Sequence, residues 1–77
     1  MNTDNLQTEL NKMDLSLSEK QILEGVVMGL SNSEIANQTF KTEQTVKLEF
    51  EAIKEKLELN SRAKVIVHFL NLINYYN

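Results

Sequence analysis

The chain has 77 residues, of which 42% are hydrophobic, and it carries a formal net charge of −3. A chain this short forms one small domain and buries only about 60 to 65% of its unfolded surface, so a partner subunit would add stability. The absence of cysteine excludes a disulfide framework, a thiolate nucleophile and a zinc finger, and it fits a cytoplasmic protein. The longest apolar run, residues 65–73, is shorter than the roughly 20 residues of a membrane span, and the N-terminus lacks the apolar segment of a signal peptide. We therefore expect no membrane partner.

The residue types present do not support catalysis. No nucleophile, metal-ligand cluster or phosphate-binding loop accompanies the acidic side chains. His68 is the only histidine, and a single histidine on an apolar helix is more often a packed side chain than a ligand. We therefore expect no enzyme activity, no cofactor and no metal site.

The N-terminal segment allows two interpretations. Residues 3–13 form a short amphipathic helix with Leu6, Leu10 and Met13 on one face, or they are a frayed tail. Both remain open. We therefore divide the chain into an N-terminal tail or short helix, residues 1–14, and a helical domain, residues 15–77.

The first clear helix begins after Ser16. Ser16 and Glu19 form a capping box, in which each side chain accepts a backbone N–H of the other residue. Gly29 is placed to end the helix, because glycine adopts the left-handed conformation at least cost. Gly25 in mid-helix costs about 1 kcal/mol relative to alanine, so either another helix crosses closely there or the site is weak. The buried face is expected to hold Ile22, Leu23, Val26 and Leu30.

A second capping box, Ser31 with Glu34, begins a short helix near Asn32, and the helical pattern is lost at residues 38–41. Thr42 then caps a longer helix, residues 43–57. One apolar seam runs along that helix: Val46, Phe50, Ile53 and Leu57. Two helices joined by so short a turn predict a helix-turn-helix, whose second helix usually enters the major groove of DNA.

The last helix is expected from Arg62 to Tyr76, with Ser61 as its cap. It is apolar on more than one side, whereas a small four-helix domain needs to bury only one side of such a helix. The surplus predicts a dimer formed through this helix. The residues assigned to that interface are Val65, Phe69, Leu72, Ile73 and Tyr76.

Five blocks resemble, in the same order, the signature of the LuxR or GerE type of DNA-binding domain: L-S-x-x-E at 15–19, G-L-S-N-S-E-I-A at 29–36, T-E-Q-T-V-K at 42–47, I-x-x-K-L at 53–57 and N-S-R-A at 60–63. The resemblance runs from Leu15 to about Leu70. It implies an all-α, four-helix bundle of a bacterial transcription regulator, in which the third helix enters the major groove and the fourth commonly forms a dimer. Because no receiver or ligand-binding domain precedes it, we expect the stand-alone GerE-like form.

The resemblance also implies roles for particular residues. The side chains expected toward base edges are Gln44, Thr45, Lys47 and Leu48, with Glu51 at a further base-facing position. Those expected toward phosphates are Lys41, Thr42, Lys54 and Arg62. Three positions depart from the family pattern: Lys41 replaces a buried aliphatic residue, Glu49 stands where histidine is frequent, and Glu58 stands where glycine usually ends the helix.

A second function stays open because of charge. At about 100° per residue, the ridge farthest from the core holds Gln44, Leu48, Glu51 and Glu55. Glutamate can accept a hydrogen bond from cytosine N4, and leucine can contact a thymine methyl, but carboxylates gain nothing from phosphate. The alternative is a protein-interaction module that keeps the fold and uses its acidic third helix or apolar fourth helix to antagonise another regulator.

Overall fold

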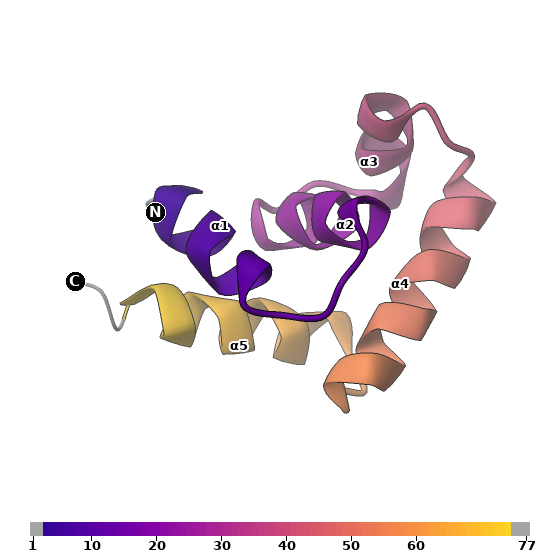
Figure 1. Cartoon of the computed structure of the whole chain (residues 1–77). Coiled ribbons are helices and arrows are strands. Elements are labelled where there is room, and N and C mark those ends of the chain that lie inside the picture. The colour runs from indigo at the N-terminus through magenta and orange to yellow at the C-terminus, as the bar shows by residue number, and fades with distance from the viewer. Residues whose placement is uncertain (1–2, 75–77) are drawn as a thin grey trace.

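The computed structural model describes residues 3–74, with side chains from residue 5 onward, and this part of the chain contains five helices and no strand (Figure 1). The all-helical fold predicted from the sequence is thus confirmed. The helices are α1 (Thr3–Asn11), α2 (Leu17–Val27), α3 (Asn32–Thr39), α4 (Glu43–Leu57) and α5 (Arg62–Asn74). The expected end of the last helix, at Tyr76, lies outside the described residues.

Both predicted capping boxes are present, with matching geometry. In each, the serine Oγ accepts the glutamate N–H at 3.1 Å, and the glutamate Oε1 accepts the serine N–H at 2.9 Å. The backbone N–H of Ser31 stabilises the charged form of Glu34 and so lowers the pKa of that carboxyl. Thr42 caps α4 by accepting the N–H of Thr45 at 3.1 Å, and Gly29 follows α2 with φ 86°. The starts of α2, α3 and α4 are therefore fixed by hydrogen bonds between a capping residue and the residue three positions after it.

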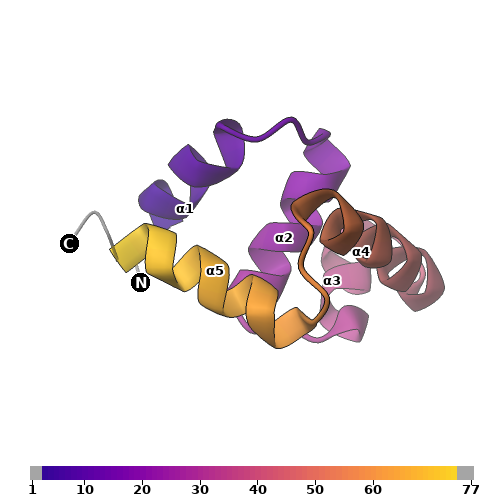
Figure 2. The same cartoon turned by 90° about the horizontal axis from the view of Figure 1, so that it is seen from below.

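The N-terminal segment is a helix, and it packs along α5 (Figures 1 and 2). Leu6 and Leu10 have no exposed surface. Gln7 Nε2 donates to Glu24 Oε2 at 2.8 Å, which also ties α1 to α2. The segment is thus part of the same core as the helix-turn-helix.

This packing buries most of the predicted dimer face within the chain. Val65 and Phe69 have no exposed surface and Ile73 only 1%, because α1 and α2 cover that side of α5. Leu72 is half-buried against the same core, and Tyr76 lies outside the described residues. The sequence shows how much apolar surface α5 carries, but a second helix of the same chain buries the side that we assigned to a partner.

Gly25 lies where α3 crosses α2. A Cβ atom built on Gly25 would lie 2.6 Å from Ile35 Cγ1, closer than real Cβ contacts allow. Ile35 is itself 1% exposed and β-branched, so it has little freedom to move away. Of the two explanations left open by the sequence, the structure has the close helix crossing.

Replacing Gly25 by alanine should therefore destabilise the protein although alanine favours helix. The overpacking cost is about 1 to 3 kcal/mol, and a contact as short as 2.6 Å with a buried side chain places it above the propensity gain of about 1 kcal/mol. The matched control is Asn37→Ala, at an exposed position in α3, which should raise the melting temperature slightly. Thermal unfolding measures both, and a Gly25→Ala variant that melts higher than wild type would contradict the crossing.

Candidate nucleic-acid interface

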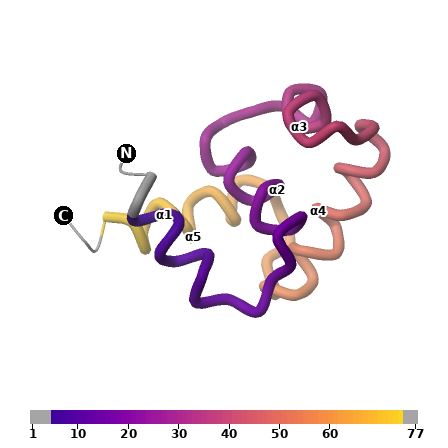
Figure 3. Tube along the Cα trace, turned by 45° about the horizontal axis from the view of Figure 1, so that its top comes forward, coloured from indigo at the N-terminus to yellow at the C-terminus, as the bar shows by residue number. Residues whose placement is uncertain are grey.

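Helix α4 buries one side and exposes the other. Val46 and Ile53 have no exposed surface and Phe50 has 5%, because this seam packs on α2 and α3. In Figure 3, α4 lies at the edge of the molecule farthest from α1, with α2 between them. The outer side consists of exposed residues: Gln44, Lys47, Leu48, Glu51 and Glu55. The ridge predicted from helical geometry is therefore the exposed side of α4.

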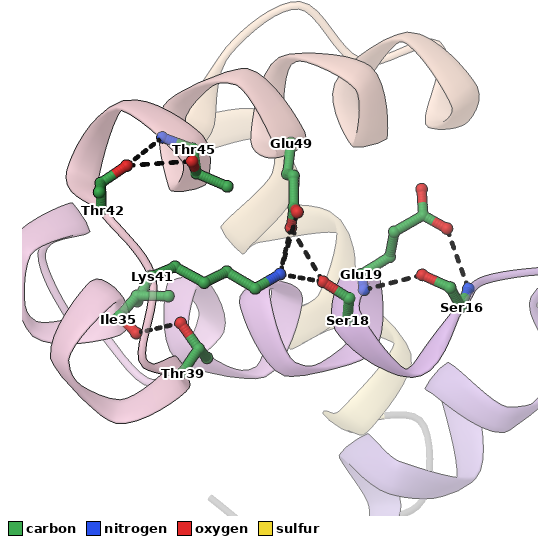
Figure 4. A network of polar contacts seen from close by, with 9 residues as sticks. All are labelled: Ser16, Ser18, Glu19, Ile35, Thr39, Lys41, Thr42, Thr45 and Glu49. Atoms are coloured by element: carbon green, nitrogen blue, oxygen red, sulfur yellow. Dashed lines mark hydrogen bonds and ion pairs between the residues drawn. The ribbon is translucent and has the colours of Figure 1, made fainter.

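The two threonines assigned to DNA hold the start of α4. Thr42 Oγ1 accepts the Thr45 N–H and also donates to Thr45 Oγ1 at 3.0 Å (Figure 4). Thr42 is exposed, whereas Thr45 is half-buried. Their first role in this structure is to fix the N-terminus of α4, whose free N–H groups favour anions.

Lys41 lies at the centre of a polar network rather than on the surface. Its Nζ is 2.9 and 2.8 Å from the two carboxylate oxygens of Glu49, and it also contacts Ser18 Oγ (Figure 4). Ser18 in turn donates to Glu49 Oε2 at 2.9 Å. The Lys41 hydrogen bond lowers the pKa of the Glu49 carboxyl, against the opposing effect of partial burial. We call Ser18, Lys41 and Glu49 the turn network, because they join the turn to α2 and α4.

The turn network explains two departures from the family pattern together. A lysine in place of a buried aliphatic residue is costly unless it has a partner, and the glutamate in place of histidine supplies that partner. Ser18 and Glu49 were not among the predicted site residues. The signal that identifies the Lys41–Glu49 pair is that these two departures carry charges of opposite sign, one in the turn and the other about two helical turns into α4.

Arg62 is also used within the chain. Its Nη1 donates to Asn32 Oδ1 at 2.7 Å and its Nη2 to the Leu30 carbonyl, while its Cζ lies 5.6 Å from the centre of the Phe50 ring. These contacts clamp the start of α5 to the loop between α2 and α3. In this arrangement contacts within the chain use two of the five N–H donors of the guanidinium.

Lys54 and Glu51 form an ion pair on the outer side of α4, with Nζ and Oε1 2.9 Å apart. The Lys54 side chain is only 18% exposed, and its Nζ lies 5.4 Å from the centre of the Phe50 ring. Glu51 remains 58% exposed. The lysine thus approaches the glutamate from the protein side and leaves the carboxylate facing outward.

Lys47 differs from the other cations assigned to DNA. The structure gives its ammonium group no hydrogen bond or ion pair with residues 5–74, although Glu43 and Glu51 lie one helical turn away on either side. Lysine without a partner on an exposed helix face is available to a phosphate or a guanine.

Other kinds of site find no support in the part of the chain that the structure describes. It contains no cluster of three or more metal-ligating side chains. Among its helices, none combines the length and apolar character needed to cross a bilayer.

Helices α3 and α4, packed together and joined by a short turn, form a helix-turn-helix domain. The sequence profile of the bacterial regulatory proteins of the luxR family matches residues 13–69, and the chain belongs to this family. The matched region includes α2, α3, α4 and most of α5. No curated protein and no solved structure matched the chain.

The pKa shift of Glu49 gives a pH test of the turn network. Because its folded-state pKa is lowered, its contribution to stability is present above the unfolded pKa near 4.3 and is lost as pH falls through the folded value. Glu49→Gln should therefore lower stability at neutral pH by about 1 kcal/mol, or roughly 4 to 8 °C in Tm, and this difference should disappear in acid.

The control for this prediction is Glu55→Gln on the same helix, since the structure gives Glu55 no ion pair among residues 5–74. Thermal unfolding from pH 3 to pH 7 compares the two variants with wild type. If Glu49→Gln lowers the melting temperature by the same amount at pH 3 as at pH 7, the loss of stability comes from packing and not from the ion pair.

Proposed function

We propose that this protein is a transcription regulator that binds duplex DNA as a dimer, with α4 in the major groove. The observation that carries the proposal is the family match across the entire helix-turn-helix. The exposure of Gln44, Lys47 and Leu48 on one side of α4 supports it. Lys47 would reach a guanine or a phosphate, and Leu48, which is 60% exposed, a thymine methyl.

The electrostatic part of this binding is expected to be small. The chain has a net charge of −3, and Lys41 and Arg62 are held by contacts within the chain. Few phosphates are then neutralised by each subunit, so the salt dependence should be shallow for a DNA-binding protein. Affinity would instead depend on two subunits binding together.

The other side of α5 supports the dimer. Val67 is 54% exposed, and it lines a hollow of about 370 Å³. The remaining lining residues are Leu59, Ala63, Lys64 and His68. An apolar hollow along one exposed helix is a surface that a second copy of the same helix could cover about a twofold axis.

The proposal predicts that Lys47→Glu loses DNA binding by about tenfold or more without loss of thermal stability. The variant removes one phosphate or base contact and adds a carboxylate at the same place. Lys20→Glu is the matched control, because it changes the net charge equally on α2, where its side chain faces Asn11 of α1. Titration of labelled duplex at several salt concentrations measures both.

If wild type binds duplex DNA and Lys47→Glu binds it equally well, the outer side of α4 does not lie in the major groove. A wild-type protein that binds no duplex even at low salt would refute DNA binding itself.

A separate variant tests the dimer. Val67→Glu should shift sedimentation toward monomer and keep the fold, since the side chain is half-exposed. Leu48→Glu, at an exposed apolar position of α4, should leave sedimentation unchanged. Phe69→Glu is unsuitable, because it would bury a charge in the core. Wild type that sediments as a monomer at high concentration would contradict the dimer.

A second candidate function is that of a protein-interaction module that blocks another regulator. One observation favours it: a hollow of about 520 Å³ lies beside α4, with Leu48, Ala52 and Leu59 in its lining and the acids Glu51 and Glu55 among them. Such a surface suits an amphipathic helix of another protein. Wild type without affinity for duplex DNA at low salt would favour this function over the first.

A further inference from the structure

Glu51 is an acidic residue on the side of α4 that would face DNA. The groups around it favour a role in base recognition. An isolated carboxylate in the major groove is repelled by the phosphates on both sides. Here Lys54 Nζ lies 2.9 Å from Glu51 Oε1, so the charge of the carboxylate is offset within one helical turn. The pair as a whole carries no net charge.

The same ion pair orients the carboxylate. Lys54 is held on the protein side, since its side chain is 18% exposed and packs over the Phe50 ring. Glu51 precedes Lys54 by three residues, a spacing at which opposite charges on a helix surface attract each other. Lys54 is the one residue among 5–74 with which the Glu51 carboxylate has an ion pair or hydrogen bond. An ionised carboxylate has about four acceptor positions, so acceptor capacity remains on a side chain that is 58% exposed.

We propose that Glu51 is a specificity residue that accepts a hydrogen bond from N4 of a cytosine, and that Lys54 is the positioning residue that holds it for this contact. The inference rests on the proposed function, with α4 in the major groove. In that groove the amino group of cytosine is a donor, and carboxylate oxygens are its natural acceptors. Thymine and guanine present acceptors there, which repel a carboxylate, and adenine places its N6 donor beside the N7 acceptor, which makes it a poorer partner than cytosine.

This assignment gives Lys54 a role different from the phosphate contact that the sequence suggested. Removal of the lysine leaves the glutamate without its partner. The carboxylate then loses both its orientation toward cytosine and the positive charge that offsets its repulsion by nearby phosphates. Lys54 and Glu51 should therefore affect the same base pair of the binding site, whereas a lysine that contacts phosphate changes affinity for all sequences alike.

The test is selection of duplex oligonucleotides from a random pool, followed by competition titrations. Wild type should select a site with one position in each half-site at which cytosine is preferred, by about tenfold or more over other bases. Glu51→Ala should remove the preference at that position only. Lys54→Met should weaken it at the same position, and Lys54→Arg, which also pairs with carboxylate, should retain it. Both substituted side chains keep the aliphatic packing on Phe50.

Lys56→Met is the matched control, because Lys56 is on the same helix but pairs with Glu19, at 2.9 Å, on α2. It should leave the selected sequence unchanged. If wild type selects a site and Glu51→Ala selects the same one, the inference is wrong while DNA binding stands. If Lys54→Met lowers affinity evenly for all sequences, Lys54 is a phosphate contact and the positioning role is wrong. A wild type that binds no duplex overturns the proposed function and this inference with it.

Discussion

The ion pair between Lys41 and Glu49 ties α4 to the turn and, through Ser18, to α2. The apolar seam of α4 decides which side of the helix is buried, but apolar contacts tolerate small rotations and shifts. The turn network adds directed contacts at 2.8 to 2.9 Å between the turn, α2 and α4. Because the outer ridge lies opposite the seam, the angle at which Lys47 and Glu51 face a ligand depends on these contacts.

Pairing inside the chain also offsets part of the acidic charge beside the surface that we propose for nucleic acid. Lys41, Lys54 and Lys56 form ion pairs with acids, and Arg62 binds Asn32 and the Leu30 carbonyl. The acids Glu49, Glu51 and Glu19 are correspondingly offset. The net charge of −3 is therefore a poor guide to the field along α4. The cost is that few cations remain for phosphates, so recognition would depend more on base contacts and on the second subunit.

The packing of α1 on α5 accounts for much of the apolar surface of the C-terminal helix. With Leu6 and Leu10 fully buried, the N-terminal helix completes the core and closes the side of α5 that holds Phe69. The surface left for a second copy is the narrower one around Val67, next to the end of α4. A dimer formed there would set the distance between two copies of α4, and thus the spacing of half-sites on DNA.

The sequence by itself determined the starts of α2, α3 and α4, the class of fold and the buried seam of α4, because capping boxes and helical periodicity depend on residues three or four apart. It also gave the exposed ridge of α4, and with it the position of Lys47. Only the tertiary structure decided which charged groups on that ridge are free and which are paired. Lys41 meets Ser18 across 23 residues, and Arg62 meets Asn32 across 30. Contacts between residues so far apart depend on how the helices cross. Local sequence patterns, which involve residues three or four apart, do not determine that crossing.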